Sequence, residues 1–228
     1  MHTPATSPID SPLNPVCLVF DATFFGRHYG FLIFRSGGKN IHAMEIDGEK
    51  MRYIEAGLVH LKTSGWHFTS ITIDGRRGVI ALIKKHFPAA AIQLCIFHQK
   101  AIIQRYTTSR PKTDCGKDIR QLMNDMLTLD QKTFTHRLHT IKRDHRDFLR
   151  ERNELGQFKH RRLRSALRSL SSNLQYLFTY KNYPNLRIPN TTNSCDGSFA
   201  HWKAKVKIHR GLRQDRRAKM IRFLLDKS

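Results

Sequence analysis

A continuous apolar run, Val-Cys-Leu-Val-Phe at residues 16–20, is followed directly by Asp21. A half-exposed strand alternates apolar and polar residues, whereas an uninterrupted run of this length is typical of a strand buried on both faces. Such a strand requires neighbouring strands in a sheet and further layers that cover the sheet. The run therefore predicts that the chain is built around a central sheet.

The segments that follow predict the rest of this sheet and its helices. Four further strands are expected, at residues 28–35, 40–46, 68–73 and 91–97. Gly37-Gly38 predicts a hairpin turn between the first two of these. Helical spacing predicts helices over 49–63, where Gly65 ends the helix, and over 77–86. The order strand, strand, strand, helix, strand, helix, strand indicates the α/β class with a mixed five-stranded sheet.

Beyond residue 100 the strand patterns give way to helical ones. Leucines recur at spacings of four and three along one predicted helix, at Leu163, Leu167, Leu170, Leu174 and Leu177. The opposite side of that helix carries Arg161, Arg162, Arg164 and Arg168, so the helix is amphipathic. We expect an all-helical insertion over about 101–185 in a single domain at 16–228, and two more helices near 194–208 and 213–226. Residues 1–15, rich in Pro, Ser and Thr, predict a disordered lead-in.

The chain carries a large excess of positive charge. Lys and Arg number 40 against 18 Asp and Glu, which gives a formal net charge of +22. Cations that neutralise phosphates release counterions, so a protein of this charge is suited to binding a polyanion such as nucleic acid. The alternative is a basic surface with no such partner.

The apolar and cysteine patterns bear on where the chain resides. The longest apolar stretches fall well short of the roughly 20 residues that a membrane span needs, and no charged start leads into an apolar run as in a signal peptide. The four cysteines are scattered and predict no disulfide framework, which favours a reducing cell interior. They are Cys17, Cys95, Cys115 and Cys195.

Two aspartates stand where predicted strands end. Asp21 follows Val-Cys-Leu-Val-Phe, and Asp74 follows Ile-Thr-Ile. If these strands are neighbours, both carboxylates emerge at one edge of the sheet, where they can bind hard divalent cations. Two such ions support phosphoryl transfer by activating the attacking oxygen and stabilising the leaving one. The alternative is that Asp74-Gly75 is an ordinary turn pair and that Asp21 caps a turn.

A third acid is expected on a helix that packs beside the sheet, and Asp196 is our candidate. On that helix Asp196, Lys203 and Lys207 share one face, while Phe199, Trp202 and Val206 share another that packs inward. On such a face the acid could bind a metal ion, and the two lysines could contact a DNA strand that leads away from the metal. The alternative is an acidic first turn favoured by the helix dipole. Glu151 and Glu154 are alternative candidates for the third acid, but they lie in a charged segment that is expected to be exposed to solvent.

Taken together, these motifs resemble the catalytic region of DDE transposases with a ribonuclease-H-like fold, and specifically bacterial insertion-sequence transposases of the Mutator-like group. The matching segments cover roughly residues 16–225. They are Phe-Asp21-Ala-Thr-Phe-Phe, Ile-Asp74-Gly-Arg-Arg-Gly, Gln-Leu-Cys95-Ile-Phe-His98-Gln, Pro-Asn-Thr-Thr-Asn-Ser-Cys-Asp196-Gly-Ser-Phe and Lys-Ile-His209-Arg210-Gly-Leu.

The resemblance implies a catalytic mechanism. It implies that Asp21, Asp74 and Asp196 hold two Mg²⁺ ions, with Mn²⁺ able to take their place; the family usually has Glu at the third position. Water would attack the phosphodiester at the transposon end, and the freed 3′ hydroxyl would then attack target DNA. Two alternatives stay open: a ribonuclease-H-like nuclease that cuts without joining, and an inactive, truncated remnant that only binds DNA.

The resemblance also carries expectations for other residues and for partners. Cys95 and His98 form a family motif, for which shaping the site or touching DNA is favoured over binding zinc. The alternative is a buried cysteine and a hydrogen-bonded histidine with no direct role. Lys203, Lys207, His209 and Arg210 are candidates for contact with the DNA backbone. The family's N-terminal DNA-binding region is expected to be missing from this chain. The expected partners are transposon ends, target DNA and further copies of the chain, with no membrane, in the bacterial cytoplasm at the nucleoid.

Overall fold

In this computed structural model, residues 14–209 and 211–226 are described, without the side chains of Arg77, Asp196, Gln214 and Asp226. The predicted lead-in lies largely outside these residues. The α/β class with a mixed five-stranded sheet is confirmed, in the strand order β3-β2-β1-β4-β5. The strands are β1 Val16–Gly26, β2 Tyr29–Ser36, β3 Lys39–Ile46, β4 Phe68–Ile73 and β5 Ala91–Leu94.

The sheet combines antiparallel and parallel pairing. β1, β2 and β3 form an antiparallel meander, and β1 also pairs in parallel with β4, which pairs in parallel with β5. This arrangement is compatible with a ribonuclease-H-like fold. The predicted Gly37-Gly38 turn joins β2 to β3, and both glycines have positive φ, +55° and +81°, a conformation that glycine adopts without steric cost.

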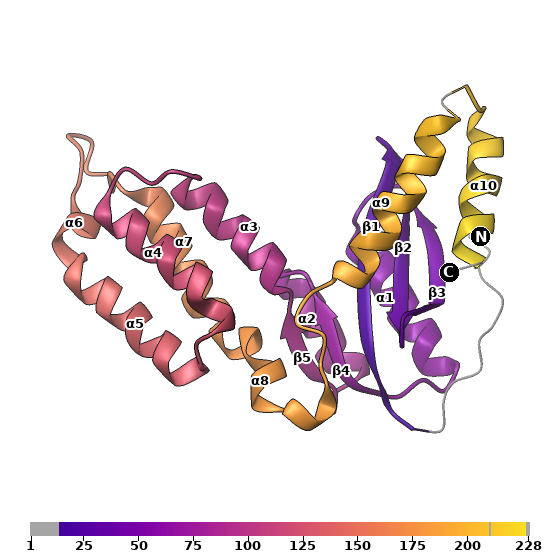
Figure 1. Ribbon diagram of the computed structural model, residues 1–228, viewed down its shortest axis with the longest axis horizontal. Coiled ribbons are helices and arrows are strands. Elements are labelled where there is room, and N and C mark those ends of the chain that lie inside the picture. The colour runs from indigo at the N-terminus through magenta and orange to yellow at the C-terminus, as the bar shows by residue number, and fades with distance from the viewer. Residues whose placement is uncertain (1–13, 210, 227–228) are drawn as a thin grey trace.

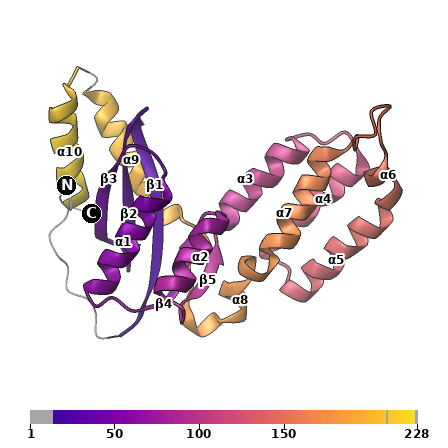
Figure 2. The ribbon, with the colours of Figure 1, turned by 180° about the vertical axis from the view of Figure 1, so that it is seen from behind.

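Helices cover both faces of the sheet (Figures 1 and 2). On one face lie α1 Met51–Thr63 and α2 Arg77–His86, and on the other lie α9 Asn193–Ile208 and α10 Gln214–Asp226. Leu18, Phe20 and Phe34 belong to the core on the α1 side, whereas Val19 and Ile33 belong to a second core with α9 and α10. The alternation places successive strand residues on opposite faces, so β1 and β2 are buried on both sides, as the apolar run predicts.

The segment between β5 and α9 is helical and extends to one side of the sheet (Figure 1). It contains α3 Ile96–Thr107, α4 Asp114–Asn124, α5 Gln131–Asp144, α6 Arg146–Arg150, α7 Arg161–Leu177 and α8 Thr179–Asn182, with short 3₁₀ turns at Asp125–Leu127 and Pro184–Leu186. The apolar leucine stripe of α7 faces inward, with Leu163, Leu167, Leu170 and Leu177 buried. We call this segment, residues 96–186, the helical insertion.

A buried polar network joins the insertion to the sheet. The Gln93 side chain of β5 donates to the carbonyl oxygen of Leu177 at 3.1 Å and accepts from the backbone N–H of Tyr180 at 2.9 Å. Asn173 of α7 donates to Oε1 of Gln99 in α3 at 2.8 Å, and Gln99 donates to Ser169 at 3.1 Å. Buried amides with these partners fix the orientation of α7 relative to α3 and β5.

Two strand boundaries differ from those predicted. The first strand was expected to end before Asp21, but β1 continues to Gly26, because Phe24 pairs with Gly30 in the hairpin with β2. The last strand was expected over 91–97, but β5 ends at Leu94 and Cys95 is the N-cap of α3. The Cys95 and His98 pair therefore belongs to the start of a helix.

Two further expectations concern cysteines and membrane contact. All four cysteines are free thiols. Of the helices in the described part of the chain, none has the length and apolar character that crossing a bilayer demands.

Candidate functional site

Asp21 and Asp74 are brought together by the parallel pairing of β1 with β4. Val19 lies opposite Thr72 in this pairing, and the two aspartates each follow two residues later. Pairing with β4 ends near this level although β1 itself continues, so Asp21 lies where the two strands part. Both aspartates line one small cavity of about 30 Å³. The expectation that these two acids meet at one edge of the parallel part of the sheet therefore agrees with the geometry.

The two carboxylates have different environments. The Oδ1 atom of Asp21 accepts a hydrogen bond from the backbone N–H of Ala22 at 2.8 Å. Asp74 is partly buried, and burial raises the pKa of its carboxyl, although the nearby His98 lowers it. Arg76 lies close by, with Nε 3.6 Å from Oδ2 of Asp74, and also forms an ion pair with Glu49. A desolvated carboxylate beside a second acid gains from any cation that enters the cavity.

His98 is electrostatically coupled to both acids. Its pKa is raised to about 9, first by a hydrogen bond with Cys95 and then by the negative charges of Cys95, Asp21 and Asp74, against the opposing effect of burial. Burial by itself raises the pKa of the Cys95 thiol, but hydrogen bonds with His98 and Thr192 lower it overall. Cys95 is 1% exposed. The pair thus forms a buried sulfur beside a cationic ring that interacts electrostatically with both aspartates.

The first turn of α9 adjoins this pair. Thr192, the N-cap of α9, donates its backbone N–H to Sγ of Cys95 at 3.3 Å, and its hydroxyl lies 3.4 Å from Nδ1 of His98. Asp196 lies four residues further along α9, about one helical turn on. Its side chain lies outside the described part of the chain, so its convergence with Asp21 and Asp74 stays a prediction.

The packing of α9 agrees with the amphipathic pattern read from the sequence. Phe199, Trp202 and Val206 are buried with Cys195 against β1 and β2. Lys203, Lys207 and His209 are exposed, and Arg210 lies outside the described residues. The rival acids Glu151 and Glu154 are exposed, and Glu151 lies 3.6 Å from Lys159 in an ion pair. These glutamates belong to the loop region between α6 and α7, well along the insertion.

Asp21 and Asp74 suit a hard divalent cation. Carboxylate oxygens are the ligands that Mg²⁺ prefers, usually one or two from the protein with water and substrate phosphates completing the shell. Among the side chains that the structure describes, no group of three or more His, Cys, Asp or Glu is arranged to hold a metal ion. The side chain of Asp196, the expected third acid, is not among those that the structure describes.

Two features of the site have no clear signal in the sequence. Arg76 is followed by a second arginine, and the sequence does not indicate which of the two lies near Asp74. Its contact with Glu49 joins segments that are distant in the chain. Asn173 lies beneath the Asp74-Gly75 turn, where a Cβ added to Gly75 would meet its Nδ2 atom at 3.6 Å. The predicted helical face of α7 gives no indication of this contact, because it depends on how α7 packs.

Comparisons with known proteins give no family for this chain. No protein-family model matches it, and a search of curated proteins finds no match. The geometry and chemistry of the site therefore carry the functional proposal.

Proposed function

We propose that this chain is a DDE-type DNA transposase that catalyses metal-dependent DNA cleavage and strand transfer. The observation that carries the proposal is the placement of Asp21 and Asp74, which lie two residues beyond the last residue pair of the parallel strands β1 and β4 and line one cavity. Thr192, the N-cap of the helix bearing Asp196, contacts His98, whose pKa is raised by both aspartates. The formal charge of +22 supports a polyanionic substrate.

The residues of the site have different roles in the proposed reaction. Asp21 and Asp74 would hold Mg²⁺, or Mn²⁺ in its place, and Asp196 would complete the ligand set. When bound, two such ions polarise the attacking oxygen and stabilise the leaving oxygen of a phosphodiester. His98 offsets the repulsion between the two described carboxylates. Cys95 and Thr192 hold His98 in place, so the protein acts by positioning and electrostatics.

Partners and location follow from the same proposal. Transposon ends and target DNA are the substrates, with Lys203, Lys207, His209 and Arg210 as contacts to the backbone along and just after α9. Two transposon ends have to be held side by side for transfer to target DNA, so the active form is a homo-oligomer. The site of action is the bacterial cytoplasm, at the nucleoid.

Assays of nicking and joining on labelled duplex DNA test this proposal. Wild type is expected to nick DNA and join the freed 3′ end only when Mg²⁺ or Mn²⁺ is present, and Asp74→Asn is expected to lose at least about a hundredfold in rate. The exposed Asp144→Asn is the matched control. Cleavage without joining would assign the chain to the nucleases instead, and equal activity of wild type and Asp74→Asn would refute the site.

A further inference from the structure

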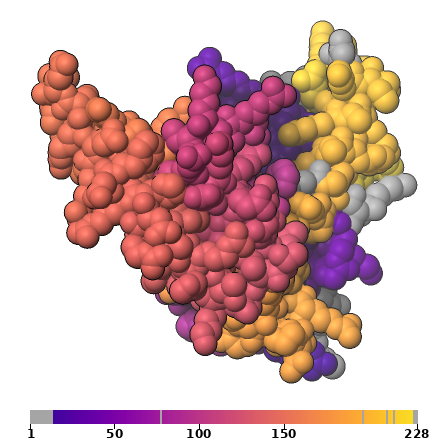
Figure 3. All heavy atoms as spheres, turned by 60° about the vertical axis from the view of Figure 1, so that its left-hand side comes forward, coloured from indigo at the N-terminus to yellow at the C-terminus, as the bar shows by residue number. Residues whose placement is uncertain are grey.

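A second concave surface lies in the helical insertion. It is a groove of about 380 Å³ between α5, α6 and α7. It shares no lining residue with the cavity that Asp21 and Asp74 line. In the space-filling view one end of the insertion, coloured orange-red, projects to one side of the molecule (Figure 3). Five of its nine lining residues are cationic: Lys142, Arg146, Arg150, Arg164 and Arg168. Among the described residues, no Asp or Glu lines it.

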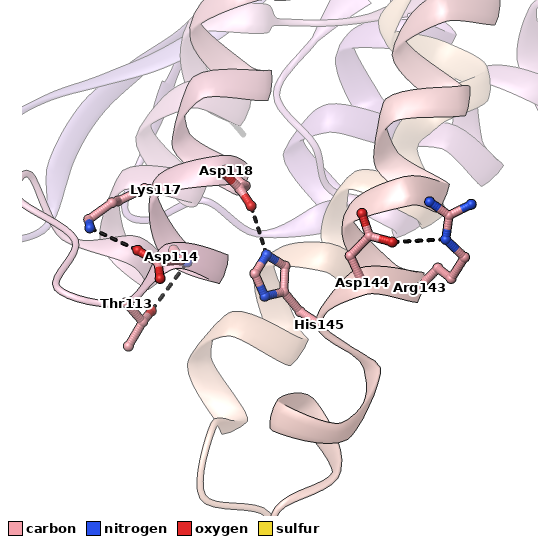
Figure 4. A network of polar contacts seen from close by, with 8 residues as sticks. Thr113, Asp114, Lys117, Asp118, Arg143, Asp144 and His145 are labelled. Carbon is pink, nitrogen blue, oxygen red and sulfur yellow. Dashed lines mark hydrogen bonds and ion pairs between the residues drawn. The ribbon is translucent and has the colours of Figure 1, made fainter.

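The groove cations lack the acidic partners that some other insertion cations have. Within the described part of the chain, none of the five forms an ion pair. Elsewhere on the insertion, Lys117 pairs with Asp114 at 2.9 Å and Arg143 pairs with Asp144 at 2.8 Å (Figure 4). The positive charge of the groove is therefore not offset by an ion pair with any described acid.

Two of the groove cations are held in place by neutral partners. Arg164 donates from Nη1 to the carbonyl oxygen of Leu149 at 3.0 Å, and its guanidinium lies 3.6 Å from the centre of the Phe158 ring. Lys142 donates to the Ser171 hydroxyl, and burial lowers the pKa of its ammonium group. A partly buried cation without a counter-charge is costly. An anion bound in the groove would remove that cost and find donors that are already oriented.

We propose that this groove binds the phosphodiester backbone of duplex DNA. The inference rests on the proposed function and adds a second contact region, separate from the cleavage site. Guanidinium groups recognise phosphate oxygens through paired hydrogen bonds. Cations contributed by three helices match a ligand with several phosphates, whereas one small anion would need fewer. Contacts of this kind position DNA without reading its sequence.

Binding of fluorescein-labelled duplex DNA, followed by anisotropy across a salt series, tests the proposal. The groove variant is Arg146→Gln with Arg168→Gln, and the control is Lys117→Gln with Arg143→Gln. Each removes two positive charges, all on exposed side chains. The groove variant is expected to bind about tenfold more weakly, with a log–log salt slope smaller by about two, and the control to stay within about twofold of wild type. Equal weakening of both variants would overturn the proposal, and circular dichroism checks that both are folded.

The outcomes separate this inference from the proposed function. If wild type nicks DNA and the groove variant binds as tightly as the control, the groove proposal fails and the transposase proposal stands. If the groove variant binds weakly but Asp74→Asn nicks as well as wild type, the groove proposal stands alone. If the groove variant keeps its affinity for DNA but loses affinity for labelled polyglutamate, the groove takes an acidic polypeptide and the proposal is overturned.

Discussion

Thr192 donates its backbone N–H to the sulfur of Cys95 at 3.3 Å, across 97 residues of sequence. The contact joins the N-caps of α9 and α3, and through His98 it connects α9 to the two aspartates of the cavity. The insertion lies between these two residues in the chain, so its fold brings α9 back to the sheet.

Replacement of Thr192 by Val tests whether the hydroxyl positions His98. The substitution removes the Oγ1 contacts with Cys95 and His98 and leaves the backbone N–H bond intact. We expect Mg²⁺-dependent nicking to fall about tenfold while stability falls by about 1 kcal/mol. Thr191→Val is the control, because among the described residues the Thr191 hydroxyl makes a single hydrogen bond, accepted from the backbone N–H of Asn193 at 3.4 Å. A loss of activity no greater than the control's would remove the proposed positioning role.

His42 is expected to make stability depend on pH. Its ring stacks on His60 at 4.2 Å, and burial together with the charge of His60 lowers its pKa to about 4 from the ordinary 6.5. The unfolded chain therefore binds a proton at higher pH than the folded chain does. The stabilising contribution is complete above pH 6.5 and is lost as pH falls toward 4, by about 2 kcal/mol at pH 5.

Urea unfolding of wild type and His42→Phe at pH 7 and pH 5 measures this contribution. Phenylalanine keeps a flat ring beside Phe34, whose ring centre lies 5.6 Å from that of His42, but it does not titrate. The variant should lose less free energy of unfolding than wild type between the two pH values. Identical losses would show that His42 does not carry the dependence.

The buried amide pair of α7 and α3 is expected to stabilise the insertion. Asn173→Ala leaves Oε1 of the buried Gln99 without its donor at 2.8 Å, and an unsatisfied buried acceptor costs about 1–3 kcal/mol. Asn182→Ala is matched to it, because Asn182 donates to Gln131 at 2.7 Å on the exposed surface. That control is expected to cost less than about 0.5 kcal/mol. Thermal unfolding of the two variants would contradict this view if their losses were equal.

The central sheet could be predicted because its signals are local. The apolar run of β1, the Gly37-Gly38 turn and the apolar spacing of α7 each depend on residues close in sequence. The extension of β1 beyond Asp21 was missed because its hairpin turn, at Arg27-His28, lacks the usual Gly or Asn. The early end of β5 was missed because Cys95-Ile-Phe also fits a strand, and only its packing against Asn190 and Thr192 starts a helix there.

The sites were partly predictable for the same reason. Asp21 and Asp74 each follow a recognisable apolar run, so their meeting follows from strand order. The coupling of His98 to both acids depends on where α3 starts, which a short motif does not define. The basic groove is lined by residues of α5, α6 and α7. The sequence pattern predicts a basic face only for α7. Surfaces assembled from several helices require the tertiary structure.

Metal binding itself is the most direct test of the claim that Asp21, Asp74 and Asp196 form one site. Electron paramagnetic resonance reports free Mn²⁺, so titration of wild type, Asp21→Asn, Asp74→Asn, Asp196→Asn and the control Asp144→Asn gives each affinity without any need for DNA. The account predicts tight binding by wild type and the control, and at least about tenfold weaker binding by each of the three site variants. Unchanged Mn²⁺ affinity in those three variants would contradict it.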